Sequence, residues 1–229
     1  MSRLGRREEE ATSGVRSEPG GRHSVEIDVG PIRLPGDLVL PPEPGAVVVF
    51  AHGSGSSRRS PRNVWVAERL QRDGLGTLLF DLLTEDEADD RALVFDIEFL
   101  ARRLEGAVRW LQALPGLDGP VALFGASTGA AAALVAASRI PGIASVVSRG
   151  GRPDLAREAL EHVAAPTLLI VGGADDVVLE LNRAAQRRIP GETRLEVIPG
   201  ATHLFEEPGA LERVAELAAS WVSTHLPTD

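Results

Sequence analysis

The sequence predicts a single α/β domain built on a mainly parallel sheet with helices on both faces. Three observations support this prediction. Short runs of β-branched and aliphatic residues recur along the chain, they alternate with segments of helical length, and 229 residues suffice for one sizeable core. Because alternating strands and helices form βαβ units, the strands are expected to be parallel and covered by helices on both sides.

Eight segments are expected to form the strands of this sheet. SVEIDV and IRLPGDLVL, which begin at Ser24 and Ile32, indicate antiparallel strands near a sheet edge. The other six resemble strands buried on both faces and lie at 46–51, 76–83, 120–126, 143–148, 167–173 and 194–200. Helices are expected at 63–72, 95–114, 128–138, 154–162, 179–189 and 211–226.

The beginning of the chain differs from the rest. Residues 1–22 are mixed in charge, rich in glycine and without an apolar signal segment, so we expect a disordered tail followed by one domain at 23–229. Within the domain the one charge run is TEDEADDR at 84–91. We expect a solvated loop there, with a rim or flap over a site as the alternative.

The composition excludes several kinds of chemistry. The chain has no cysteine, and all 24 basic residues are arginine, so thiolate nucleophiles, cysteine-based zinc sites and lysine-based sites are ruled out within it. A net charge of -9 disfavours binding to nucleic acid or to an anionic membrane. No run approaches the roughly 20 apolar residues of a membrane span. Any nucleophile and base must therefore come from Ser, Thr, His and the carboxylates.

The segment VALFGASTGAAAALVAASR (121–139) places Ser127 between an expected strand and an expected helix. It contains the pattern G-x-S-x-G, with Gly125 and Gly129 on either side of the serine. In a nucleophile elbow the serine occupies such a sharp turn and projects its hydroxyl from the sheet edge. The glycines allow the strand and the helix to approach closely. The alternative is a glycine-rich turn in which Ser127 caps the helix.

A serine nucleophile needs a base and a group that orients the base, and both belong at the carboxyl ends of parallel strands. Asp175 and Asp176 follow one expected strand, and His203 follows the last one. The chain order Ser, Asp, His is the order that accompanies such an elbow. We therefore predict a catalytic triad of Ser127, Asp175 and His203. Asp176 is expected to face solvent or cap the next helix, and Asp154 is a more distant candidate for the acid.

Two backbone N–H groups are expected to form an oxyanion hole. One belongs to Thr128, which opens the helix after the serine. The other lies in the glycine-rich segment AHGSGSS, where we assign Ser54 with Gly53 and Gly55 as alternatives. A phosphate-binding loop is the competing interpretation, but the segment lacks the GxxxxGK[ST] pattern. His52 is expected to be a structural residue of this loop.

With the motifs AHGSGSS, FGASTGAAAAL, VGGADDVV and PGATHLF, the chain from Ser24 to Leu226 resembles the α/β-hydrolase superfamily, and most closely its small dienelactone-hydrolase-like members. The resemblance implies an α/β-hydrolase fold with an eight-stranded, mostly parallel sheet, and acyl-ester chemistry. Enzymes named dienelactone hydrolase use a cysteine nucleophile, whereas this chain offers Ser127, so a general serine esterase is expected. About six residues separate the strand at 143–148 from the next helix. That spacing leaves no room for a cap domain and predicts an open site.

The short loop after that strand holds Arg149, Arg152 and Asp154. We expect an ion pair between an arginine and the aspartate that fixes the loop. The alternative is an arginine that lines the site and attracts a carboxylate on the substrate.

These inferences predict a serine hydrolase that cleaves small carboxylic esters through an acyl-enzyme, without metal or organic cofactor. We expect a cytoplasmic monomer or small homo-oligomer whose partner is a small-molecule ester, not nucleic acid or membrane. The same triad would serve a thioesterase, an amidase or an acyltransferase. A non-catalytic binding protein with this fold is the rival from another class.

Overall fold

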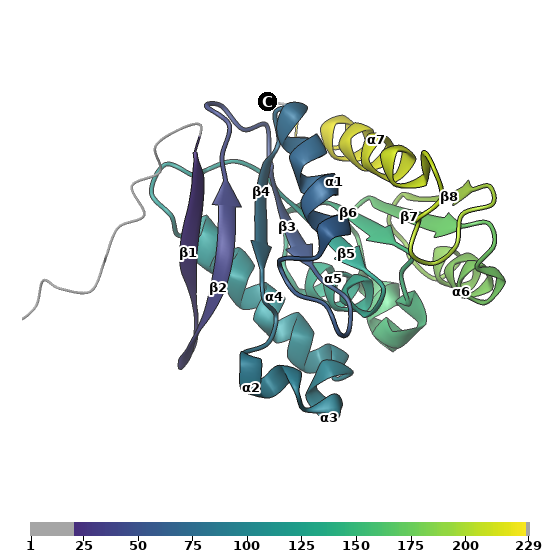
Figure 1. The fold of residues 1–229 in the computed structure, drawn as a ribbon, viewed down its shortest axis with the longest axis horizontal. Coiled ribbons are helices and arrows are strands. Elements are labelled where there is room, and N and C mark those ends of the chain that lie inside the picture. The colour runs from purple at the N-terminus through teal and green to yellow at the C-terminus, as the bar shows by residue number, and fades with distance from the viewer. Residues whose placement is uncertain (1–20, 228–229) are drawn as a thin grey trace, which may run out of the picture.

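The computed structural model describes residues 21–227 and contains one eight-stranded sheet in the order β1-β2-β4-β3-β5-β6-β7-β8 (Figure 1). Its strands are β1 (Arg22–Val29), β2 (Ile32–Val39), β3 (Val47–Ala51), β4 (Gly76–Phe80), β5 (Val121–Ala126), β6 (Ile143–Arg149), β7 (Thr167–Gly172) and β8 (Thr193–Ile198). Strands β1 and β2 pair antiparallel with each other, and β2 pairs antiparallel with β4. The strands from β4 to β8 are parallel. The predicted fold class is therefore confirmed.

The predicted tail lies almost entirely outside the described residues. Residues 1–20 are not described, and Arg22, which the sequence predicts as the end of the tail, is the first residue of β1.

Helices cover both faces of the sheet (Figure 1). They are α1 (Pro61–Arg72), α2 (Glu85–Ala88), α3 (Arg91–Val94), α4 (Ile97–Gln112), α5 (Thr128–Arg139), α6 (Asp176–Gln186) and α7 (Ala210–Thr224), together with the 3₁₀ helix η1 (Pro153–His162). Helices α1 and α7 pack on one face, while α4, α5, η1 and α6 lie on the other. Among residues 21–227, no helix is long and apolar enough to cross a membrane.

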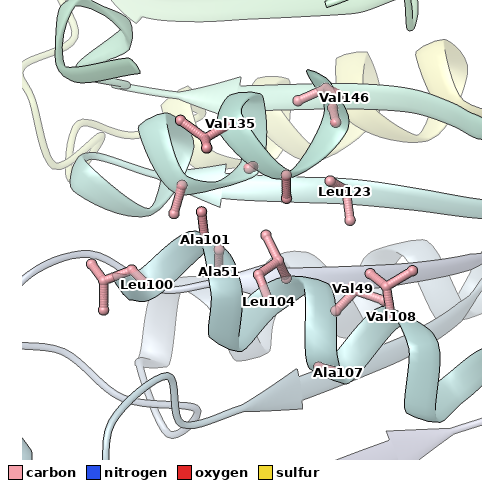
Figure 2. Close-up of a cluster of buried hydrophobic side chains, with 14 of the residues drawn as sticks. Val49, Ala51, Leu100, Ala101, Leu104, Ala107, Val108, Leu123, Val135 and Val146 are labelled. Carbon is pink, nitrogen blue, oxygen red and sulfur yellow. The ribbon is translucent and has the colours of Figure 1, made fainter. Parts of the chain in front are cut away.

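The buried core positions helix α5, which begins directly after the candidate nucleophile. Val49 and Leu123, on neighbouring strands, lie in one apolar cluster with Leu104 of α4 and Val135 of α5 (Figure 2). Residues 128–137 of α5 are all buried, and most of them are alanine. Small side chains let this helix lie close to the sheet, and a closely packed interior holds the start of the helix in one place.

The acidic stretch at 84–91 differs from the solvated loop that we expected. It forms α2 and the start of α3, and Thr84 caps α2 in a capping box with Glu87. Glu87 also pairs with Arg103 of α4, with Nη2 and Oε1 2.6 Å apart. The pattern Thr-x-x-Glu at 84–87 is the sequence signal of this box, so the short helix could have been predicted.

The helix expected at 154–162 is also different. It is the 3₁₀ helix η1, and Arg157 interrupts it with a φ of 50° and a ψ of -126°. Residues 150–166, between β6 and β7, hold only this short helix, so no cap domain is inserted there.

Candidate active site

The candidate site lies at the carboxyl edge of the parallel strands. Ser127 follows β5 and has a φ of 51° and a ψ of -119°, a backbone conformation that residues other than glycine rarely adopt. Its N–H donates to the carbonyl of Arg149 on the neighbouring strand at 3.2 Å, and its own carbonyl accepts from the N–H of Ala130 at 3.1 Å. Its side chain makes no hydrogen bond to the start of α5. The geometry is therefore that of an elbow and not that of a helix cap.

The two glycines of the motif are required by close backbone contacts. A Cβ atom on Gly129 would lie 2.2 Å from the carbonyl oxygen of Ala51 and 2.4 Å from that of His52. A Cβ atom on Gly125 would lie 2.4 Å from the Cα atom of Ala130. Both contacts are far shorter than real Cβ contacts, so a side chain at either position would force the strand and the helix apart.

The structure brings His203 and Asp175 together. Asp175 follows β7, His203 follows β8, and the His203 Nδ1 atom lies 2.7 Å from the Asp175 Oδ2 atom. Asp175 immediately precedes α6, but its side chain makes no capping hydrogen bond to the helix. The side chain is only 16% exposed. Asp176 is the first residue of α6 and is exposed. The aspartate that can orient this histidine is therefore Asp175.

The loop after β3 approaches the elbow from the other side. A Cβ atom on Gly53 would lie 3.2 Å from the Cβ atom of Ser127, so the loop backbone packs against the candidate nucleophile. The Ser54 N–H points to the start of α5, where it donates to the Thr128 Oγ1 atom at 2.8 Å. The two residues predicted to supply the oxyanion donors are thus neighbours in space, and the hydroxyl of one accepts from the other.

His52 holds this loop in place. Its Nε2 atom accepts the N–H of Leu82 at 3.0 Å, which leaves Nδ1 to donate to the carbonyl of Gly53 at 3.0 Å. The residue is only 7% exposed, and burial lowers the pKa of its imidazole below the ordinary value of 6.5. Both ring nitrogens are occupied in the neutral form, so His52 is a structural residue, as the sequence predicted.

The two arginines that the sequence places after the strand at 143–148 lie in different environments. Arg152 forms a two-pronged ion pair with Asp154, with nitrogen–oxygen distances of 2.9 and 2.8 Å. This is the expected ion pair that fixes the loop. Both carboxylate oxygens of Asp154, the more distant candidate for the acid, are bonded to Arg152 in it. Arg149 is instead the last residue of β6 and not a loop residue, and only 8% of its surface is exposed. Its guanidinium is therefore not presented at the surface, as direct binding of a substrate carboxylate would require.

A cavity of about 840 Å³ opens beside the loop that follows β3. Residues 52–61 form one wall, and residues 81–85 with Ala88, Val94 and Leu100 form much of the rest. The acidic segment that contains α2 is therefore part of a cavity rim, which was the alternative interpretation of its sequence. Sequence reasoning did not identify this wall, because no local pattern indicates that 81–100 and 52–61 face each other.

Within residues 21–227, no group of three or more His, Asp or Glu side chains is arranged to hold a metal ion.

Comparison with known proteins identifies the family. A family model described as an alpha/beta hydrolase domain matches residues 44–222. A crystal structure of dienelactone hydrolase from Anabaena variabilis is 53% identical, with a TM-score of 0.88 over 90% of this chain and 99% of that chain. The chain belongs to the α/β-hydrolase family and is similar to dienelactone hydrolase. An esterase from Pyrococcus furiosus, 17% identical with a TM-score of 0.72 over 91% of this chain and 92% of that chain, shares the fold.

Two curated proteins from Mycobacterium tuberculosis are also similar. Each is 56% identical over 219 residues and is named "Putative phosphoribosyl transferase". The match covers 94% of this chain but 49% of each relative, so the chain spans about half the length of these proteins.

Proposed function

We propose that this chain is a serine hydrolase that cleaves small carboxylic esters through an acyl-enzyme on Ser127. The observation that carries the proposal is the 2.7 Å contact between His203 and Asp175 at the sheet edge that also bears the elbow of Ser127. A nucleophile on a strained turn and a histidine oriented by a partly buried carboxylate are two components of a serine hydrolase.

The reaction follows from these roles. The Nε2 atom of His203 takes the hydroxyl proton of Ser127 while the Oγ atom bonds to the ester carbonyl carbon. The C–O bond to the alcohol then breaks, and His203 returns the proton to the departing oxygen. Water repeats both steps on the acyl-enzyme and releases the acid. Asp175 accepts the Nδ1 proton of His203 in a hydrogen bond and stabilises the imidazolium as it forms.

We assign the N–H groups of Thr128 and Ser54 as the hydrogen-bond donors to the negative oxygen of the tetrahedral intermediate. In the free protein the Ser54 N–H donates to the Thr128 hydroxyl, so we propose that the ester oxygen replaces this hydroxyl as acceptor. One such donor contributes about 2.7–4 kcal/mol to transition-state stabilisation in comparable enzymes. Gly53, which packs against Ser127, is the alternative donor on the same loop.

The substrate is proposed to be a small-molecule ester whose acyl or alcohol part enters the 840 Å³ cavity. This volume lies within the usual range for small-molecule sites, about 300–1,000 Å³. One wall carries the serines of the loop after β3, and the other includes the apolar side chains of Leu83, Val94 and Leu100. With only η1 between β6 and β7, the edge of the sheet is not covered by a cap.

The name of the curated relatives suggests phosphoribosyl transfer as a second candidate. We propose that this activity belongs to the part of those proteins that the chain does not match, because the matched part has the hydrolase fold. Incubation with phosphoribosyl diphosphate and purine bases is expected to yield no nucleotide. Nucleotide formation by this chain would contradict the assignment.

The proposed activity is tested with p-nitrophenyl esters of acetate, butyrate and octanoate. We expect turnover of the short esters by the wild type, none by Ser127→Ala, and full turnover by the control Ser138→Ala, which changes a serine at the far end of α5. Activity that survives in Ser127→Ala would overturn the proposal. If folded protein neither turns over the esters nor is labelled at Ser127 by a serine-directed phosphonate, a binding protein is favoured. Labelling without ester turnover directs the search to thioesters and amides.

A further inference from the structure

Arg149 is a buried cation that has no anionic partner among the described residues. Its Nη2 atom donates to the Oδ1 atom of Asn63 at 3.3 Å, while Nε and Nη1 are buried and have no hydrogen-bond partner among the described residues. No carboxylate of residues 21–227 lies within 4.0 Å of the guanidinium. Burial, together with the nearby charge of Arg62, lowers the pKa of Arg149 to about 10. The side chain is therefore still charged at neutral pH.

A favourable contribution to the free energy of unfolding does not explain a residue of this kind. A buried charge without a partner is costly, and its replacement by an apolar side chain of similar size is often neutral or stabilising. A buried polar group without partners calls for an explanation, and a functional role is one. The position of Arg149 in the fold points to such a role, because the residue contacts both the elbow of Ser127 and the loop that carries His203.

The backbone of Arg149 holds the elbow. Its carbonyl oxygen accepts the N–H of Ser127 at 3.2 Å, at the point where β6 ends. The N–H group of the next residue, Gly150, donates to the carbonyl of Ile170 on β7 at 2.8 Å. The end of β6 is thus tied to the strands on both sides.

The side chain of Arg149 faces the loop that carries His203. Its guanidinium carbon lies 5.9 Å from the ring centroid of Phe205, within the range of a cation–π interaction. Phe205 is buried, follows His203 by two residues and has a φ of 56°. A Cβ atom on Gly150 would lie 3.3 Å from the Phe205 ring and 3.5 Å from the Cε1 atom of His203. The loop therefore packs directly on the end of β6.

We propose that Arg149 is a positioning residue that holds the His203 loop against the Ser127 elbow through the charge of its guanidinium on the Phe205 ring. It acts through the histidine and does not touch the substrate. The charged group that acts on it is Arg62 of α1, which itself pairs with Glu206 of the His203 loop at 3.3 Å. The proposal rests on the proposed hydrolase function, so its test includes a measurement that needs no turnover.

The test compares Arg149→Met, Arg149→Lys and the control Arg188→Met, which changes an exposed arginine paired with Glu161. For Arg149→Met we expect kcat on p-nitrophenyl acetate to fall at least 10-fold, KM to stay within about twofold, and Tm to be unchanged or higher. Arg149→Lys is expected to restore most of kcat because it keeps a charge near the ring. The control is expected to match the wild type. Wild-type kcat in Arg149→Met, or a loss that follows a lower Tm and is not restored by lysine, would overturn the proposal.

A spectroscopic measurement separates this proposal from the esterase assignment. The Nδ1 proton of His203 lies in a short hydrogen bond to Asp175 and is expected to give a downfield proton NMR signal that His203→Gln removes. We expect Arg149→Met to shift or broaden this signal and Arg188→Met to leave it in place. An unchanged signal in Arg149→Met would refute the positioning role, whichever substrate the protein uses.

Discussion

The Nδ1 atom of His203 lies 2.7 Å from the Oδ2 atom of Asp175, although the residues come from loops after different strands. Strands β7 and β8 are parallel neighbours, so both loops begin at the same edge of the sheet. The neighbouring carboxylate of Asp176 starts α6 and faces outward. Although the two aspartates are adjacent in the chain, it is Asp175 that is placed to orient the histidine.

The first prediction separates the two aspartates. Asp175→Asn is expected to lower kcat on the order of 10⁴-fold, because an amide favours the wrong histidine tautomer and cannot stabilise the imidazolium. Asp176→Asn is expected to keep kcat within about twofold, since its side chain is exposed and the carboxylate that bonds to His203 is that of Asp175. Steady-state kinetics of both variants checks this. Equal losses in the two variants would show that the 2.7 Å contact is not what the reaction uses.

The second prediction concerns the Thr128 hydroxyl, which accepts the Ser54 N–H at 2.8 Å. Thr128→Val keeps the shape of the side chain and removes this acceptor, so the N–H becomes available to the substrate. Since a hydrogen bond contributes a net 0.5–1.5 kcal/mol or so, kcat/KM is expected to rise roughly two- to tenfold. Thr128→Ser keeps the hydroxyl and should match the wild type. A large fall in Thr128→Val would mean that the hydroxyl holds the loop in its working position.

The third prediction concerns the backbone contact of Gly129. An alanine there would place a methyl group 2.2 Å from the carbonyl oxygen of Ala51, which cannot move without shifting β3. We expect Gly129→Ala to destabilise the fold by about 3 kcal/mol, a Tm fall of roughly 6–12 °C in a domain of this size. Gly119→Ala is the matched control, because the nearest atom there is 3.9 Å away. Calorimetry of the two variants measures the difference, and similar Tm values would contradict the expectation.

The fourth prediction is a pH dependence of stability that arises from His52. Burial lowers the pKa of His52 in the folded protein, while the unfolded chain takes up a proton near pH 6.5. Below this pH the unfolded state binds more protons, so the free energy of unfolding falls, by at most about 1.4 kcal/mol per pH unit from this residue. His52→Gln does not titrate and should lose this part of the slope. Urea unfolding at pH 7.5, 6.5 and 5.5 compares the two proteins, and identical slopes would exclude His52 as the source.

The class of fold and the order of its elements follow from the amino-acid sequence alone. Buried strands and helices alternate clearly enough that eight strands could be predicted, because the periodicity of apolar residues is a local property. The elbow was also visible locally, since the crowding at Gly125 and Gly129 leaves its mark as a motif of adjacent residues. The capping box at Thr84 is equally local, because its Thr-x-x-Glu pattern lies within four adjacent residues.

Contacts between distant segments arise only in the folded chain. Folding puts His203 within 2.7 Å of Asp175, directs the Ser54 N–H to Thr128, and forms the cavity between the loop after β3 and α2. It also buries Arg149, which the sequence presents only as one more polar residue of a short loop. No local pattern encodes these relationships, because each depends on the spatial order of strands that are far apart in the chain, and that order is set by the packing of the whole sheet.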